Sequence, residues 1–301
     1  NHHQKNEFEK AKKLYSEILS YEANNFETIF LLGSLYAQNK EFDKAKHLLE
    51  KAIIIRPNFA DAHNNLANVL KELGEFKKAE SEYKKSIQIK PNFTDAHFNL
   101  GNVFKLLKEF EKATVCFEKA IIINPKFAEA YNNLGIVFKE LGESKKAIVC
   151  YEKAIAIKPN FADAYFNLGI AFSGFNEYQK AKSCYEKVIK INPKSADAQN
   201  NLGTIFRILG EHDKSIACYE KSTKLNPSHL YAYSNKLFST LYIEKIKPEE
   251  YLFTAKKFRS SLKKVTSNLL LENQLEANPK KLRIGFVSGD FKQHPVGYFL
   301  L

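Results

Sequence analysis

The stretch NNLGIVFKELGESKKAIVCYEKAIAIKPNFADAY, Asn132 to Tyr165, decides the fold, because the sequence on either side of it repeats the same pattern. Six prolines follow one another at a fixed step of 34 residues: Pro57, Pro91, Pro125, Pro159, Pro193 and Pro227. A compact domain with a single core has no need of such a period, whereas stacked copies of one supersecondary unit produce it. The chain is therefore predicted to be a repeat protein.

The unit that opens at Ala128 is predicted to form two helices. Apolar residues keep the 3-and-4 spacing of a buried helical stripe over about Ala128 to Leu141, and again over about Ser144 to Ile157. Gly142 is expected to end the first helix in the left-handed conformation. Pro159 is expected to stop the second, because proline has no donor for the next helical bond. Each unit is therefore predicted to be a helical hairpin.

This pattern resembles the tetratricopeptide repeat, which joins a bulky residue, leucine and glycine, and then several aromatic and alanine positions, to a closing proline. Six units match it at most positions, and they open at Phe26, Ala60, Thr94, Ala128, Ala162 and Ala196. The resemblance implies an all-α, right-handed superhelical solenoid of paired helices. Residues 1–25 are interpreted as the second helix of a partial repeat, 26–229 as six full repeats, and 230–279 as a degenerate repeat with connecting helices.

The net charge of +12 raises the possibility of nucleic-acid binding. The lysines of the second helices alternate with glutamates, as on a solvated outer face, and no basic and aromatic motif accompanies them. Nucleic acid is therefore not an expected partner. No apolar run approaches the roughly 20 residues that span a bilayer, so neither is a membrane, and a cytoplasmic location is expected. The chain has no methionine and opens inside a repeat, which suggests a piece of a longer protein.

The four cysteines follow the same period and stand at one position of the repeat: Cys116, Cys150, Cys184 and Cys218. No CxxC pair or Cys/His cluster accompanies them, so we expect buried free thiols and no metal site. His63 and His97 also share one repeat position, where other units carry tyrosine, and packing is the better account of both.

A row of asparagines recurs every 34 residues at the position before the leucine of the first helix: Asn65, Asn99, Asn133, Asn167, Asn201 and Asn235, although the last is followed by Lys236. Four residues earlier stand five acids: Asp61, Asp95, Glu129, Asp163 and Asp197. A separation of four puts acid and amide on one helical face, and asparagine is an indifferent helix former. Both rows are therefore expected along the concave groove, where amides can bind the backbone of an extended acceptor protein or peptide. The alternative is structural, with the acids capping helices and the asparagines neutral on the surface.

Residues 280–301 have a different character and contain KLRIGFVSGDFKQHPVGYFLL from Lys281. Leu282 to Ser288 is a short apolar run that suits a buried parallel strand, and a loop with His294 and a helix from Val296 would follow. This order predicts the start of an α/β, Rossmann-like domain, whose ligands bind beyond the carboxyl ends of strands. The residues alone leave the role of a single histidine open.

The RIGFVSGDF strand and the HP pair, with an inner asparagine ladder before them, resemble the protein O-GlcNAc transferases and their Spindly-like relatives, glycosyltransferase family 41. The resemblance implies transfer of N-acetylglucosamine from UDP-GlcNAc to Ser or Thr of proteins, with GDP-fucose as the alternative donor. It implies that His294 lies in the active site and that the asparagine and acidic rows hold the acceptor, and it implies no cofactor besides the nucleotide-sugar substrate. Because the sequence stops at Leu301, before the donor-binding domain, the chain by itself is predicted to be inactive. The competing hypothesis is a non-catalytic scaffold for protein–protein interaction.

Overall fold

A computed structural model describes residues 2–240, 242 and 252–260, which are helical apart from short connections. The helices are α1 (His2–Tyr21), α2 (Phe26–Gln38), α3 (Phe42–Ile55), α4 (Ala60–Glu72), α5 (Phe76–Ile89), α6 (Thr94–Leu106), α7 (Phe110–Ile123), α8 (Ala128–Glu140), α9 (Ser144–Ile157), α10 (Ala162–Gly174), α11 (Tyr178–Ile191), α12 (Ala196–Ile208), α13 (His212–Leu225) and α14 (Leu230–Thr240). Residues 252–260 are helical as well. The strand expected at 282–288 lies outside the described residues.

Each repeat forms the predicted hairpin, and α2 with α3 through α12 with α13 make six of them. In the unit that opens at Ala128, α9 has the predicted bounds, whereas α8 ends one residue early, with Leu141 as its C-cap. Gly142 then takes a φ of +78°, which only glycine adopts without strain and which closes the helix as expected. Three other hairpins turn at the same place with a side chain present, at Lys40, Lys108 and Asn176.

One continuous core runs through the array, because each hairpin buries its own seam and the faces toward its neighbours. On five of the six second helices one aromatic residue fills the seam and is fully or almost fully buried: Tyr83, Phe117, Tyr151, Tyr185 and Tyr219. In α3 the fully buried Leu49 takes this place. The four cysteines are buried just before these rings, as predicted. His63 and His97 are buried too, and each donates from Nε2 to the carbonyl of Pro57 or Pro91. The packing account of both histidines is confirmed.

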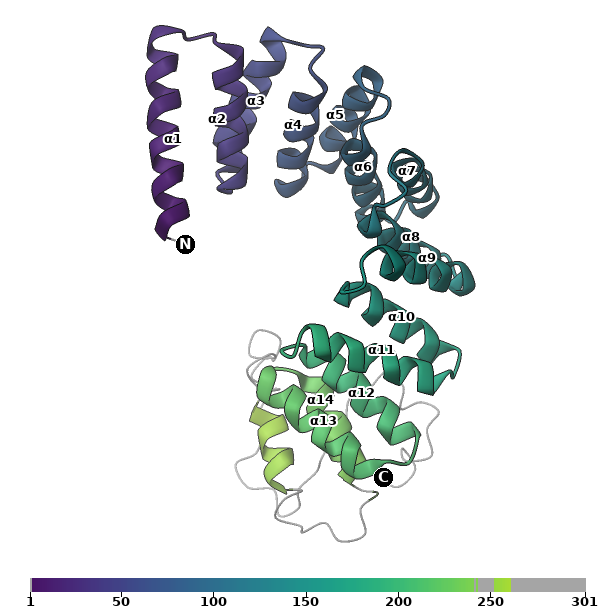
Figure 1. The fold of residues 1–301 in the computed structure, drawn as a ribbon. Helices are drawn as coiled ribbons and strands as arrows, with labels where there is room; N and C mark the ends of the chain where they lie inside the picture. Colours follow the sequence, from purple (N-terminus) through teal and green to yellow (C-terminus); the bar gives the residue numbers. More distant parts are fainter. Residues whose placement is uncertain (1, 241, 243–251, 261–301) are drawn as a thin grey trace, which may run out of the picture.

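The repeats stack along an arc, with the first helices on its inner side (Figure 1). First helices of adjacent repeats contact one another, α2 with α4, α4 with α6, α6 with α8 and α8 with α10. The second helices, α3, α5, α7, α9, α11 and α13, are further apart along the outer side. The concave surface is therefore built from the first helices, as predicted. No helix among the described residues is long and apolar enough to cross a membrane.

Candidate functional site

The concave surface is lined by four positions of each first helix, spaced four, three and four residues apart, so that they share one face. In α8 these are Glu129, Asn133, Ile136 and Glu140. We call the equivalent residues of the six first helices, α2, α4, α6, α8, α10 and α12, the concave strip. From α4 to α12 its first position is the predicted acidic row and its second carries the asparagines from Asn65 to Asn201, so the structure brings both rows together on one surface. In α2 these two positions are Glu27 and Leu31, and Asn235 stands at the equivalent place in α14.

The asparagine row links successive repeats. Asn133 donates from Nδ2 to Oδ1 of Asn102 in the preceding repeat at 2.8 Å, and Asn65 donates to Oγ of Ser34 at 3.0 Å. Asn167 instead donates to Oδ1 of Asn132 at 3.0 Å. A repeated amide hydrogen bond between neighbouring first helices contributes about 0.5–1.5 kcal/mol to stability. The asparagine row therefore has a structural role, because it joins neighbouring repeats. The alternative, in which the asparagines are neutral on the surface, did not include such a role.

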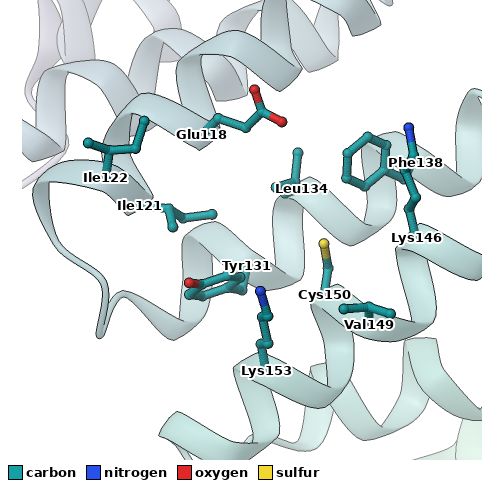
Figure 2. Close-up of a pocket in the computed structure, with 10 residues that line it drawn as sticks. All are labelled: Glu118, Ile121, Ile122, Tyr131, Leu134, Phe138, Lys146, Val149, Cys150 and Lys153. Carbon is teal, nitrogen blue, oxygen red and sulfur yellow. The ribbon is translucent and has the colours of Figure 1, made fainter.

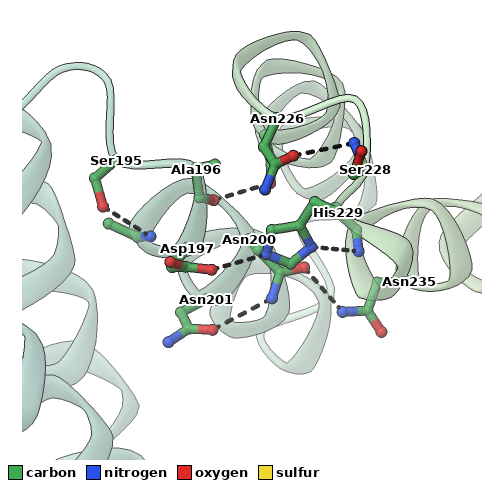
Figure 3. A network of polar contacts seen from close by, with 12 residues as sticks. Ser195, Ala196, Asp197, Asn200, Asn201, Asn226, Ser228, His229 and Asn235 are labelled. Carbon is green, nitrogen blue, oxygen red and sulfur yellow. Dashed lines mark hydrogen bonds and ion pairs between the residues drawn. The ribbon is translucent and has the colours of Figure 1, made fainter. Parts of the chain in front are cut away.

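Asn235 repeats the second arrangement, since it donates to Oδ1 of Asn200 at 3.0 Å (Figure 3). The choice of acceptor follows the residue just before the asparagine row, which alternates along the array: Phe30, Asn64, Phe98, Asn132, Phe166 and Asn200. Asn167 and Asn235 donate to the buried asparagine that the preceding repeat has there. Asn99 follows the buried Asn64 in the same way but does not donate to it, and Oδ1 of Asn64 has no partner among the described residues. Asn65 and Asn133 follow a repeat with phenylalanine there and donate instead to the third position of its concave strip, Ser34 or Asn102. Asn201 also follows a phenylalanine, but Ile170 at that third position offers no acceptor.

These bonds leave each amide with further capacity. An asparagine amide has two N–H donors and a carbonyl acceptor, and Asn133, Asn167 and Asn235 each use one donor. Asn99 makes no side-chain hydrogen bond to any other described residue. All six members of the row are half-buried, so their remaining groups face the groove. One N–H and one carbonyl side by side match the acceptor and donor of an extended peptide backbone.

The acidic row divides into paired and unpaired members. Glu129 contacts Lys158 Nζ at 2.7 Å, and this ammonium lowers the pKa of the Glu129 carboxyl. Asp197 contacts His229 Nε2 at 2.9 Å (Figure 3). Asp61, Asp95 and Asp163 form no ion pair with other described residues, and the last two are exposed.

Helix capping does not explain the acidic row. The N-cap residues of the helices that carry Asp61, Asp95, Glu129 and Asp163 are phenylalanines without a side-chain cap bond. The acids stand in the first turn instead, where the interaction of a negative charge with the helix dipole stabilises the helix by about 0.3–1 kcal/mol. The capping alternative is therefore wrong in its geometry, although a stabilising effect at the helix N-terminus remains.

The sequence interpretation missed the third position of the concave strip. It carries amides or hydroxyls in the first three repeats and then mainly apolar residues: Ser34, Asn68, Asn102, Ile136, Ile170 and Thr204. The same 34-residue step marks this row, and a helical projection would have placed it on the groove face beside the asparagines. The groove is therefore rich in amides at its N-terminal end and more apolar from α8 onward.

His294, the predicted active-site residue, lies outside the described residues. The described part of the chain holds no cluster of His, Cys, Asp or Glu that could bind a metal ion.

Comparison with protein families decides what this array is. Models of the tetratricopeptide repeat match residues 2–69, 67–108, 94–127, 116–149, 137–174, 162–195 and 196–229. The chain is a tetratricopeptide-repeat protein. Arrays of this family serve as scaffolds for protein interaction, which agrees with the exposed concave strip. No curated protein matches the chain.

Solved structures support the same fold. YrrB, described as a tetratricopeptide-repeat protein with an unusual peptide-binding site, is 25% identical with a TM-score of 0.53, over 62% of this chain and 97% of its own. MamA is 29% identical with a TM-score of 0.51, over 55% of this chain and 97% of its own. PilF of Pseudomonas aeruginosa is 22% identical with a TM-score of 0.62, over 75% and 97%, and at that identity it supports the fold alone.

Proposed function

We propose that the concave strip binds an extended segment of a partner protein. The observation that carries this proposal is the unused hydrogen-bonding capacity of the asparagine row, which recurs on the first helices α4, α6, α8, α10 and α12 and again on α14. Extended backbone needs a donor and an acceptor at intervals, and a row of half-buried amides supplies both without selecting side chains. The likeness to YrrB, a protein described as having a peptide-binding site, favours the same proposal.

The acidic row adds a preference for basic side chains to this general recognition of the backbone. Asp95 and Asp163 are exposed, and no cation of the described chain neutralises them. A bound segment with lysine or arginine near them would gain modestly, by about 0.2–1 kcal/mol for each exposed pair, and less at high salt. The preferred partner segment is therefore extended and basic rather than acidic.

A binding experiment tests this with a designed probe. The probe is a fluorescein-labelled, Ser- and Thr-rich peptide of about 15 residues with spaced lysines, and its control has alternate backbone nitrogens methylated. The array should bind the first peptide and lose most of that affinity for the second, because methylation removes the backbone donors. Replacing Asn99, Asn133 and Asn201 by alanine should weaken binding, whereas Asn160→Ala, in an exposed turn, should not. Equal binding of both peptides would refute backbone recognition.

We further propose that the array presents acceptor polypeptides to an O-linked glycosyltransferase centre. This proposal is supported by the sequence resemblance at Lys281–Leu301 and by the asparagine row that precedes it. UDP-GlcNAc is the proposed donor, with GDP-fucose as the alternative. The longest protein that the gene encodes should transfer labelled sugar from one of these donors to Ser- or Thr-containing peptides. If neither sugar is transferred, the non-catalytic scaffold is the correct function.

A further inference from the structure

The outer side of the array carries two adjoining grooves between its second helices. One lies between α5 and α7, with a volume of about 560 Å³, and the other between α7 and α9, with about 430 Å³. Both are lined by Glu118 and Ile122 of α7, so they adjoin along this helix. Their floors contain Cys116 and Leu100 in one and Cys150 and Leu134 in the other. Figure 2 shows the second groove, with Cys150 and Leu134 facing it from different helices.

The helix between the two grooves exposes apolar side chains that the repeat does not require. Val115 is 65% exposed and Ile122 is 70% exposed, seven residues apart on the outer side of α7, and Val149 on α9 is 49% exposed. The other second helices of the six repeats carry at these two places the pairs His47 and Ile54, Ser81 and Gln88, Val149 and Ala156, Ser183 and Lys190, and Ala217 and Lys224. Only α7 joins two large apolar residues there, so stacking of repeats does not explain them.

The polar residues that line the grooves are mainly basic. Lys84, Lys119, Lys146 and Lys153 line them, against the single carboxylate of Glu118. Lys84 already contacts Glu80 of its own helix, and Lys146 contacts Glu143, the N-cap residue of α9. Lys119 and Lys153 form no ion pair with other described residues, although Lys153 lies over the ring of Tyr131. Two lysines without a carboxylate partner beside an apolar floor favour a partner with acidic edges and an apolar centre.

We propose that α5, α7 and α9 form a second docking surface, separate from the concave strip, which binds an acidic amphipathic helix of a partner protein. A helix satisfies its own backbone, whereas an extended segment would leave donors and acceptors unpaired over a floor of leucine, isoleucine and cysteine. An apolar stripe with 3-and-4 spacing would pack beside Val115 and Ile122, as ridges pack into grooves between helices. Its flanking carboxylates would then lie near Lys119 and Lys153.

The test uses a designed peptide helix of about four turns, with leucine at every third or fourth position and glutamate elsewhere, labelled with fluorescein. It should bind saturably, with a Kd below about 1 mM, and more weakly as salt is raised. The double variant Val115→Ser, Ile122→Gln takes the residues that α5 carries at the same positions, so the fold should be kept. It should weaken binding by about tenfold or more. The matched control is Ile54→Gln on α3, where the side chain is 78% exposed and remote from the grooves, and it should change nothing.

The cysteines supply an internal readout of where the probe sits. Bound probe should slow alkylation of Cys116 and Cys150, which lie in the grooves, and leave Cys184 and Cys218 unchanged. The Asn99, Asn133 and Asn201 alanine variant should bind this probe normally, so failure of one surface is distinguishable from failure of the other. Absence of saturable binding would overturn the proposal, as would equal binding of a peptide with lysine for every glutamate. Self-association of the chain that the double variant abolishes would also overturn it, because a second copy would then be the occupant.

Discussion

Tyr151 lies so close to Gly135 that a Cβ built on residue 135 would be 2.5 Å from Cε1 of the ring and 2.8 Å from Cδ1. A Cβ carbon essentially never comes within about 3 Å of a ring carbon, so the glycine permits this contact between α8 and α9. Ala67 and Tyr83 stand at the equivalent positions in α4 and α5, and there Tyr83 donates from its hydroxyl to Oδ1 of Asn68. The hydroxyl of Tyr151 has no partner among the described residues. The hairpin of α4 and α5 thus accommodates the methyl group of Ala67 beside the ring of Tyr83, whereas the hairpin of α8 and α9 needs a glycine beside the ring of Tyr151.

Gly135→Ala should lower the free energy of unfolding by about 1–3 kcal/mol, because the added methyl group overpacks a buried seam. Urea unfolding measures this. Gly174→Ala is the matched control, since Gly174 also lies in a first helix but has no atom within 4 Å of its Cβ position. The control should change stability by no more than about 0.5 kcal/mol. Equal stability of the two variants would show that the ring moves aside freely.

Asn167→Ala should destabilise the array, whereas Asn99→Ala should not. Asn167 supplies the hydrogen bond to the carbonyl of Asn132, which is only 6% exposed, so its removal leaves a buried acceptor unpaired. The expected cost is about 1–3 kcal/mol. Asn99 occupies the same repeat position without such a bond, so the difference between their melting temperatures isolates the link between repeats. Identical melting temperatures would mean that the row stabilises nothing.

The buried thiols should make the array less stable in alkaline solution. Burial raises the pKa of Cys116, Cys150 and Cys184 from the ordinary value of 9.0 to about 11. The unfolded chain therefore releases these protons near pH 9 and the folded chain only near pH 11. Between these values the unfolded state binds fewer protons, so stability falls as pH rises, and below about pH 9 the thiols add no slope.

Urea unfolding at about pH 8 and about pH 10 measures this loss. A variant with alanine at all three cysteines should show a smaller loss between the two conditions, since its remaining slope comes from other groups such as Tyr83 and Tyr151, whose pKa burial also raises. An unchanged pH dependence in that variant would count against the thiols.

Most of the architecture could be predicted from the sequence because the same pattern of residues recurs every 34 residues. The proline step set the period, the 3-and-4 spacing set the helices, and Gly142 marked the turn that the structure confirms with its positive φ. Lys40, Lys108 and Asn176 make the same turn without glycine, and only the period places the turn in those repeats.

Contacts between repeats were harder to predict. Asn133 and Asn167 share one repeat position, yet they donate to residues 31 and 35 positions earlier. The acceptor depends on whether phenylalanine or asparagine occupies a neighbouring position of the previous repeat, and this alternation has a period of two repeats. A consensus sequence derived from single repeats does not show this alternation. The outer grooves escaped prediction for a related reason, since exposed Val115 and Ile122 resemble core residues when only hydrophobicity is read.

Deleting the whole repeat from Ala128 to Phe161 should preserve the fold, because each repeat packs mainly against its neighbours. Asn167 would then follow a repeat with Phe98 and Asn102, the arrangement that Asn133 now uses, so it keeps an acceptor. Helical content per residue from circular dichroism should stay constant, and the melting temperature should fall modestly. Deleting only 128–143 should do much more harm, because α9 would lose the partner of its apolar face. Equal damage from both deletions would show that the hairpin is not the structural unit.

His294→Ala should separate chemistry from binding if the glycosyltransferase proposal holds. A transferase that moves a sugar to a Ser or Thr hydroxyl must orient that hydroxyl and assist the departure of its proton. In the longest protein that the gene encodes, loss of a general base or acid should lower kcat by about 10²–10⁴-fold. The Asn99, Asn133 and Asn201 alanine variant provides the opposite case, because it should raise KM for long acceptor peptides and leave kcat almost unchanged. A histidine with only a structural role would lower the melting temperature, and turnover would fall in proportion to the folded fraction. Near-normal turnover in a fully folded His294→Ala protein would remove this residue from the proposed mechanism and leave the peptide-binding role of the repeats untouched.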